Sequence, residues 1–308
     1  MATALEPDLA AAPAPRPADD AELEARRRTQ TRVRFELLSG MVRKDFKLKY
    51  QGSVLGFIWS LINPLFLFAV YGFVFGLVLG TGIPGFPIYV MSGLLTWNLF
   101  AGSLAGSTMA VVGNAGLVKK VRFPLQVLPL SVVGFAIVQY VLQMAVLLVV
   151  VVSVRAHDLG LNTLLAVPAL TVAIVFTCGC CFAASALNVR YRDTGHLVEL
   201  LLIAWFWLTP CIYGAGLIAK LVGDHHTVPQ WLYRVYFSDP LAIVVATMQR
   251  AIYGDDLARN GGGQRVLAAA GYSFYLEQLA VAGVIAVTTF WLGRRLFRRM
   301  QADFAEEL

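Results

Sequence analysis

Charged residues are scarce in this sequence. Lys, Arg, Asp and Glu make up 14% of the 308 residues, whereas soluble domains carry about 25%. Apolar residues make up 58%, above the roughly 45–50% of an ordinary globular domain. Both departures exclude a typical soluble domain and indicate that much of the chain lies in a lipid bilayer.

A nucleotide-binding phosphate loop is also missing. The pattern G-x-x-x-x-G-K-[ST] does not occur, and no Gly is followed by Lys anywhere in the chain. Such a loop supplies the backbone amides and the lysine that hold ATP phosphates. We therefore expect no conventional ATPase site and no enzymatic activity in this chain.

Residues that bind metals or form disulfides are few. The four cysteines include a C-x-C-C cluster, Cys178 to Cys181, inside an apolar run, where small residues typically pack transmembrane helices. The four histidines fall in predicted loops or at span ends. His225 and His226 are the best metal candidates, but solvated loop residues are the more common case, so no metal site is expected.

Acidic residues are absent from the middle of every long apolar run. Glu199 and Glu277 lie near the ends of two of these runs. Transporters driven by protons or sodium often bury acids deep in a span. This pattern argues against ion-coupled transport and favours energy supplied by a separate subunit.

Long apolar runs define the fold class. A transmembrane helix needs about 20 predominantly apolar residues, and six segments qualify. They are Val54–Leu79, Pro87–Val112, Pro124–Val154, Leu161–Leu187, Leu197–Val222 and Phe274–Phe297. We predict an all-α polytopic membrane protein with six transmembrane helices.

The distribution of Lys and Arg sets the orientation. With both termini inside, eighteen of these residues flank the spans on the inner side and six on the outer side. Cytoplasmic loops carry such an excess of positive charge. We expect a multi-pass protein of the cytoplasmic (inner) membrane with both termini cytoplasmic and no nucleic-acid partner.

The chain divides into four predicted parts. Residues 1–30 are expected to be a disordered cytoplasmic tail, 31–53 an amphipathic interfacial helix, 54–300 the transmembrane domain and 301–308 a second cytoplasmic tail. In the second part apolar residues recur at helical spacing among basic ones. That helix is either an anchor on membrane lipids or also a docking surface for a cytoplasmic partner.

A further apolar stretch between spans five and six is too short to cross the bilayer. Pro240–Ile252 follows four aromatic residues suited to a membrane interface, namely Trp231, Tyr233, Tyr236 and Phe237. We predict outer re-entrant helices here, with Pro210 bending the fifth span beside them. The segment is either a gate over a channel or an interfacial anchor.

Four stretches, in this order, resemble a known family. They are Lys49–Leu65 (KYQGSVLGFIWSLINPL), Gly93–Phe100 (GLLTWNLF), Asn188–Asp193 (NVRYRD) and Trp207–Tyr213 (WLTPCIY). Together they resemble the ABC-2 type permeases that export polysaccharides such as O-antigen, capsule and teichoic acid. The resemblance covers roughly residues 30–300, and its first and third stretches are the most specific.

The resemblance implies partners that composition alone does not. It implies a homodimer of permeases, two copies of an ABC ATPase subunit that binds ATP and Mg²⁺, and a lipid-linked glycan that passes between the permeases. Sugar rings stack on aromatic side chains, and weak contacts at many sites allow passage. Candidate channel residues are Trp59, Trp97, Phe100, Trp205, Trp207 and Tyr213, although aromatics also pack cores and face lipid.

Two inner loops are candidates for partner contacts. In the family, a loop such as 113–124 contacts the ATPase, and here it carries Leu117, Val118, Lys119, Lys120, Arg122 and Phe123. The alternative is that the positive charges of this loop only set the orientation of the chain in the membrane. Arg190, Arg192 and Asp193 are candidates for guiding a phosphate-bearing substrate into the channel, while Arg192 and Asp193 are equally interpretable as a local structural pair.

Other functions stay open at this point. An ABC-2 exporter of a drug or of another lipid would share most of these features. A membrane glycosyltransferase is less expected, because such enzymes need acidic residues near the membrane surface, and the best candidates, Asp255 and Asp256, belong to no recognisable motif.

Overall fold

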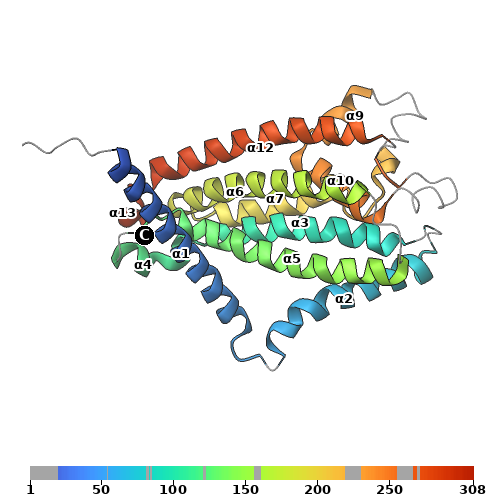
Figure 1. Cartoon of the computed structure of the whole chain (residues 1–308), viewed down its shortest axis with the longest axis horizontal. Coiled ribbons are helices and arrows are strands. Elements are labelled where there is room, and N and C mark those ends of the chain that lie inside the picture. The colour runs from blue at the N-terminus through green and yellow to red at the C-terminus, as the bar shows by residue number, and fades with distance from the viewer. Residues whose placement is uncertain are drawn as a thin grey trace, which may run out of the picture.

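The computed structural model describes residues 20–53, 55–80, 83, 85–120, 123–155, 161–218, 230–254, 266–268 and 271–308. Every regular element within these ranges is a helix. The long helices run side by side as one bundle (Figure 1). The predicted all-α class is confirmed.

Five helices are long and apolar enough to cross a membrane. The first is α2 (Trp59–Tyr71), which continues as the π-helix η2 (Gly72–Val78). The others are α3 (Phe86–Thr108), α5 (Val127–Arg155), α6 (Ala166–Arg190), preceded by the 3-10 turn η4 (Leu161–Leu165), and α12 (Tyr272–Met300). They coincide with five of the six predicted spans.

The position of the predicted fifth span holds a shorter helix. Helix α7 (Thr194–Leu208) has 15 residues, about 22 Å at 1.5 Å per residue, which is less than the roughly 30 Å of a hydrocarbon core. Thr209 adopts an extended conformation, as expected for a residue before proline. Pro210 therefore ends the helix, and the count of six full spans is not confirmed.

The two ends of the bundle differ in what they carry. One end gathers α1 (Asp20–Tyr50), η3 (Val112–Asn114), α4 (Ala115–Lys120) and α13 (Phe304–Glu307), and we call it the basic end (Figure 1). The opposite end carries α9 (Gln230–Phe237) and α10 (Pro240–Tyr253). The segments whose positive charges predict a position on the inner side of the membrane therefore lie together at the basic end of the bundle.

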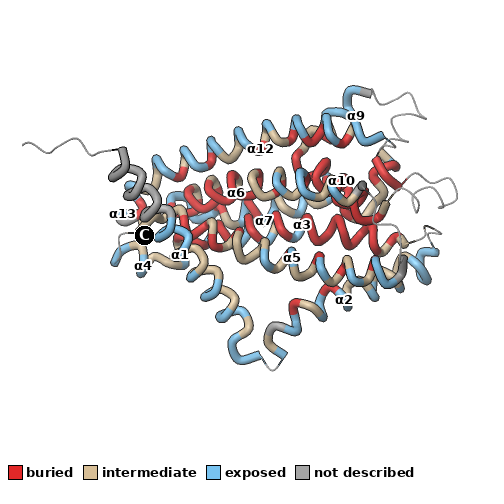
Figure 2. The backbone as a smooth tube through the Cα atoms, in the orientation of Figure 1, coloured by how far each residue is buried: buried red, intermediate tan, exposed pale blue. Residues whose placement is uncertain are grey.

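Helix α3 forms the centre of the bundle. It packs against α5, α6 and α10, and Figure 2 shows it and α10 as mostly buried elements. Five buried hydroxyl residues of α3 donate hydrogen bonds to carbonyls of their own helix, three or four residues back, which satisfies these groups without water. They are Ser92, Thr96, Ser103, Ser107 and Thr108.

Helices α6 and α12 form the closest contact in the bundle through two glycines. A Cβ atom on Gly293 would lie 2.1 Å from the backbone oxygen of Gly179. A Cβ atom on Gly179 would lie 2.6 Å from the backbone nitrogen of Phe290. Small residues allow membrane helices to approach in this way, and no passage is left between these two backbones.

Helix α1 rests on the start of α5 at the basic end. The rings of Phe46 and Phe135 lie 4.6 Å apart, and the side chain of Val42 lies over Gly134. Burial raises the pKa of Asp45, an effect that the charge of neighbouring Lys44 opposes. One face of α1 is therefore packed, while residues such as Phe35 stay exposed.

Candidate functional site

Three of the predicted channel aromatics lie together inside the protomer. Trp97 and Phe100 on α3 are 6% and 1% exposed. The ring of Phe100 lies 5.4 Å from that of Trp205 on α7 and 5.8 Å from that of Phe176 on α6. In this conformation the cluster packs α3, α6 and α7 together.

Trp205 also positions the N-terminus of α10. Its indole Nε1 donates a hydrogen bond to Asp239 Oδ2 at 2.8 Å. The other carboxylate oxygen of Asp239 accepts from the backbone nitrogen of Leu241 at 3.2 Å, the usual role of an N-cap residue. Trp205 thereby fixes the start of a buried helix to α7.

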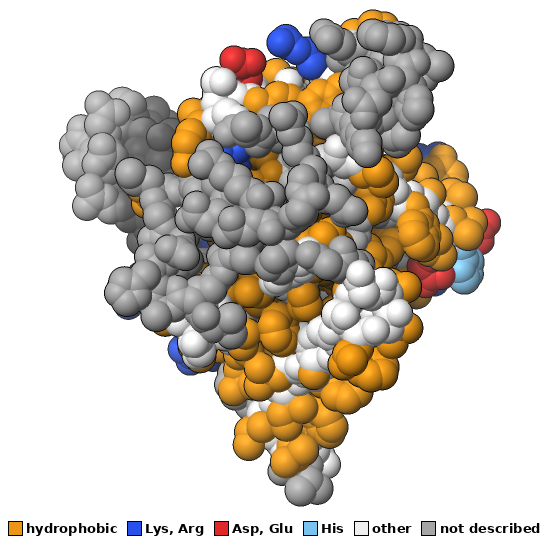
Figure 3. All heavy atoms as spheres, turned by 90° about the vertical axis from the view of Figure 1, so that its right-hand side faces the viewer, with side chains coloured by type: hydrophobic (Ala, Val, Ile, Leu, Met, Phe, Trp, Pro, Cys, Tyr) orange, Lys and Arg blue, Asp and Glu red, His pale blue; other side chains and the backbone are white. Residues whose placement is uncertain are grey.

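The remaining channel candidates are more accessible. Trp59 at the start of α2 and Trp207 near the end of α7 are 50% and 66% exposed, and Tyr213 is half-buried. Figure 3 shows that the described side chains at the opposite end of the bundle are mostly hydrophobic, down to the protruding α2. Trp59 and Trp207 are thus available to contact another molecule.

Sequence reasoning missed an exposed stripe on α3. Asn98, Gly102, Ala105 and Met109 recur at intervals of three or four residues and are exposed on one face of an otherwise buried helix, as helical geometry requires. Helix α7 packs beside α3. The signal was present in the sequence, because Asn98 is a polar residue in the middle of an apolar run.

Tyrosines join the predicted gate segment to the loop after α7. The hydroxyls of Tyr213 and Tyr236 lie 3.0 Å apart, and Tyr236 donates to the Leu208 carbonyl at 2.6 Å. Tyr233 donates to the Ala268 carbonyl. Phe237 is fully buried, whereas Trp231 is 63% exposed. Three of the four gate candidates therefore hold α9 in place.

Helix α10 is buried along its whole length. Gln249 Nε2 donates to the Pro210 carbonyl at 2.8 Å, and the Arg250 guanidinium lies 4.5 Å and 4.7 Å from the ring centres of Tyr272 and Tyr275. The helix contacts α3, α6 and α12. It closes the centre of the bundle at the opposite end.

The α6–α7 turn carries the residues predicted to guide substrate. Arg190, Arg192 and Asp193 are all exposed, and the Arg190 guanidinium lies 5.7 Å from the ring centre of Tyr191. No ion pair is recorded between Arg192 and Asp193, both of which lie within the described ranges. Their charges thus face the surroundings of the basic end.

Asn188 holds this turn in place and was not singled out from the sequence. Its side chain donates to the Thr108 carbonyl at 2.9 Å and accepts from the backbone nitrogen of Gly195 at 3.2 Å. Asn188 is 2% exposed. One buried amide therefore links the end of α3, the end of α6 and the start of α7.

The predicted ATPase-coupling residues divide between surface and core. Leu117, Lys119 and Lys120 on α4 are exposed. Val118 and Phe123 pack against a buried cluster that includes Phe304 of α13, and Arg122 lies outside the described residues. Lys44 Nζ of α1 lies 3.5 Å from Asn114 Oδ1 of η3, and α4 contacts both η3 and α13, so these four helices form one surface.

Potential metal ligands do not gather in the part of the chain that the structure describes. Within the described ranges, no group of three His, Cys, Asp or Glu side chains is placed to hold a metal ion. The pairs His225–His226 and Asp255–Asp256 lie outside those ranges.

Comparison with known proteins shows which family the chain resembles. The ABC-2 type transporter family matches residues 36–253. An O-antigen export system permease protein RfbA from Myxococcus xanthus is 29% identical over 272 residues, covering 88% of this chain and 95% of that protein. Two proteins of the same name from Klebsiella pneumoniae are each 29% identical over 275 residues, covering 89% of this chain and 95% of their own length.

Proposed function

Since this chain belongs to the ABC-2 type transporter family, we propose that it is the permease of an ATP-driven exporter that moves a lipid-linked polysaccharide across the cytoplasmic membrane. The similarity to O-antigen export permeases over 88–89% of the chain carries this proposal. ATP binding and hydrolysis belong to a separate subunit. A strain lacking this chain is expected to accumulate lipid-linked glycan on the cytoplasmic side of the membrane. An unchanged amount of glycan at the cell surface would contradict the proposal.

The conduit lies between two copies of the chain. The interior of one protomer is filled by the Trp97, Phe100 and Trp205 cluster and by α10. The exposed stripe of α3 from Asn98 to Met109, together with the exposed Trp207 of the neighbouring α7, offers a polar and aromatic surface instead. A second copy facing this surface would enclose a path lined by weak contacts.

The replacement Asn98→Trp tests this location. A bulky ring in the middle of the path is expected to reduce export strongly, measured as glycan at the cell surface. Thr288→Trp on α12 is the matched control, because Thr288 is also polar and exposed in the middle of a long helix, but α12 packs on α6 and α10. Equal export in both variants would show that the exposed stripe of α3 does not line the conduit.

The surface of α4 couples the permease to its ATPase. Leu117 is 37% exposed and precedes the packed Val118 on this helix. Leu117→Asp would bury an unpaired charge at this apolar contact and is expected to weaken co-purification of the ATPase. Leu164→Asp, also at an exposed apolar position but near the opposite end, should leave co-purification unchanged.

The α6–α7 turn guides the phosphate-bearing end of the substrate. Arg190 and Arg192 are exposed there, and guanidinium groups bind phosphate oxygens in pairs. Replacing both with Gln is expected to slow export while the ATPase still co-purifies. Normal export by this variant would mean that the two arginines only help to set the orientation of the chain in the membrane.

Helices α9 and α10 form a re-entrant pair at the outer end, and both termini lie in the cytoplasm. Tyr236 and Trp205 connect this pair to α7, so movement of α7 is passed to it. Cross-linking α9 to the loop after α7 is expected to block export if the pair is a gate. A reporter that works only in the cytoplasm should be active when it is fused after Leu308.

A further inference from the structure

A cavity of about 670 Å³ opens at the basic end of the protomer. Helix α1 and the start of α5 form one side, and α6 and the last turns of α12 form the other. Its polar residues are Arg34, Gln126, Arg294, Arg298 and Gln301. This volume lies within the roughly 300–1,000 Å³ of pockets that hold small organic ligands.

The floor of the cavity is apolar. Leu38, Leu130, Phe182 and Phe290 line it. These four residues are buried or half-buried, whereas the three arginines are exposed. The cavity therefore has two parts, a rim with three guanidinium groups and a hydrophobic base. This combination fits an amphiphile with an anionic head group and a hydrocarbon body.

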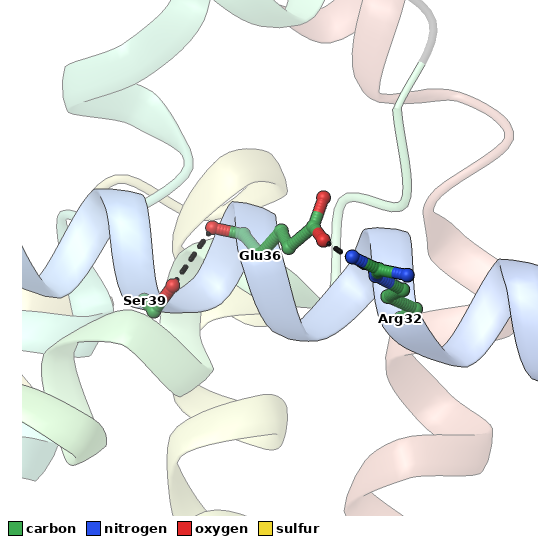
Figure 4. Close-up of polar contacts among 3 residues, drawn as sticks. All are labelled: Arg32, Glu36 and Ser39. Atoms are coloured by element: carbon green, nitrogen blue, oxygen red, sulfur yellow. Dashed lines mark hydrogen bonds and ion pairs between the residues drawn. The ribbon is translucent and has the colours of Figure 1, made fainter.

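The three arginines have no carboxylate partner recorded within the described ranges. The acidic residue nearest to Arg34 along α1 is Glu36, and its carboxylate is engaged elsewhere. Arg32 Nε donates to Glu36 Oε1 at 2.9 Å, one turn back on α1, and Ser39 Oγ donates to the Glu36 carbonyl (Figure 4). The positive charge at the rim is thus uncompensated by these side chains.

The cavity does not lead into the bundle. At its floor, the rings of Phe182 and Phe290 lie 5.9 Å apart, and the adjoining backbones of α6 and α12 approach closely at Gly179 and Gly293. The exposed stripe of α3 that we assign to the conduit lies on a helix that does not line the cavity. A cavity closed off in this way suits a ligand that stays bound more than it suits cargo in transit.

We propose that this cavity binds the head group of an anionic glycerophospholipid of the surrounding membrane. Arg34, Arg294 and Arg298 hold the phosphate by charge-assisted hydrogen bonds, and the acyl chains lie over the apolar floor. Basic pockets between helices on the cytoplasmic side of membrane proteins bind such lipids. The ligand bridges α1 to α12, and the proposal is independent of the cargo that the permease exports.

Thermal unfolding of the purified full-length chain in a neutral detergent tests the proposal. A ligand that binds only the folded state raises the unfolding midpoint, and the rise grows with the ratio of the ligand concentration to its dissociation constant. Dioctanoyl phosphatidylglycerol is expected to raise the midpoint, and dioctanoyl phosphatidylcholine to raise it much less. In the double variant Arg294→Gln and Arg298→Gln, the apparent affinity for phosphatidylglycerol should fall at least about tenfold, since charge-assisted bonds are the strong ones.

The matched control is the double variant Arg295→Gln and Arg299→Gln. These residues lie on the same turns of α12 and carry the same charge, but they do not line the cavity. The Arg295 guanidinium instead lies 5.1 Å from the ring centre of Trp291. This control should keep the response to phosphatidylglycerol, and an equal loss in both variants would overturn the proposed site.

A second variant separates loss of binding from loss of folding. Leu38→Trp fills the floor without changing any charge and should also abolish the response to phosphatidylglycerol, while the midpoint without lipid stays close to that of the wild type. A full response in Leu38→Trp would contradict the proposal. So would a polyprenyl diphosphate that binds through the same arginines more tightly than phosphatidylglycerol, because the occupant would then be a carrier lipid.

Discussion

Helices α2 and α3 follow each other in the chain, and both are apolar enough to span a membrane, yet they have opposite environments. The span of α2 and η2, Trp59–Val78, is the more hydrophobic of the two, but only 6% of its most apolar window is buried within the protomer. For α3 the buried share is 72%. In a protein that spans the bilayer, hydrophobicity therefore reports contact with lipid or with a second chain more than burial in the core.

The residues of the two helices reflect this difference. The interior of α3 uses small and hydroxyl-bearing residues that satisfy their own hydrogen bonds, such as Ser92 and Ser103. The surface of α2 and η2 uses large apolar residues such as Phe66 and Phe73, 64% and 59% exposed. Between membrane helices, packing replaces the hydrophobic effect as the main attraction.

The largest expected effect comes from removing a ring inside α3. Phe100→Ala should lower the stability of the protomer by on the order of 3 kcal/mol, because the cavity left between Phe176 and Trp205 cannot close. Phe66→Ala on α2 is the control and should change the stability of the isolated protomer little. Thermal unfolding in detergent measures both, and equal losses would break the contrast between the two helices.

A smaller loss is expected from adding one methyl group to α3. A Cβ atom on Gly93 would lie 2.6 Å from Gln249 Nε2, which donates to the Pro210 carbonyl. Gly93→Ala should therefore cost about 1–3 kcal/mol through a lost buried hydrogen bond. Gly76→Ala in η2 meets nothing within 4 Å, and it should be neutral or slightly stabilising. Similar midpoints for the two variants would contradict this reading.

The buried amide of Asn188 should contribute somewhat less. Asn188→Ala removes one donor and one acceptor that connect three helices, and we expect a loss of about 1–2 kcal/mol. Asn98→Ala on the exposed stripe of α3 is the matched control for stability, because its side chain is exposed. A larger loss for Asn98 than for Asn188 would show that the exposed stripe is already covered in the purified protein.

The smallest effect is expected within α3 itself. Ser103 Oγ donates only to the Leu99 carbonyl of the same helix, and such local bonds contribute little to helix stability. Ser103→Ala should change stability by less than about 0.5 kcal/mol, in keeping with substitutions that break no connection between elements. A loss as large as that of Asn188→Ala would mean that hydroxyl groups of α3 also bind neighbouring helices.

Much of the fold was predictable because its signal is one of length and hydrophobicity. The predicted span at 87–112 corresponds to Phe86–Thr108, and that at 274–297 to Tyr272–Met300. The fifth span was not predictable in its extent, because the apolar run continues past Pro210 while the helix ends at Leu208.

The site was less predictable because composition does not tell which face of a helix is covered. Trp97 and Trp59 both occur in stretches that resemble the family, but one is 6% and the other 50% exposed. Asn188 was within a recognised motif, yet its hydrogen bond to Thr108 joins residues that are 80 positions apart, which no local pattern reveals.

Burial of α10 on every side imposes an order of assembly on the protein as it is made. With 14 residues, or about 21 Å, the helix is too short to be left in the membrane as an independent span. Its surroundings include α12, which is synthesised after it, and Arg250 lies against Tyr272 and Tyr275 of that helix. Until the ribosome has synthesised residues 272–300, the packing around α10 is incomplete. The insertion of the last long helix, α12, therefore completes the fold.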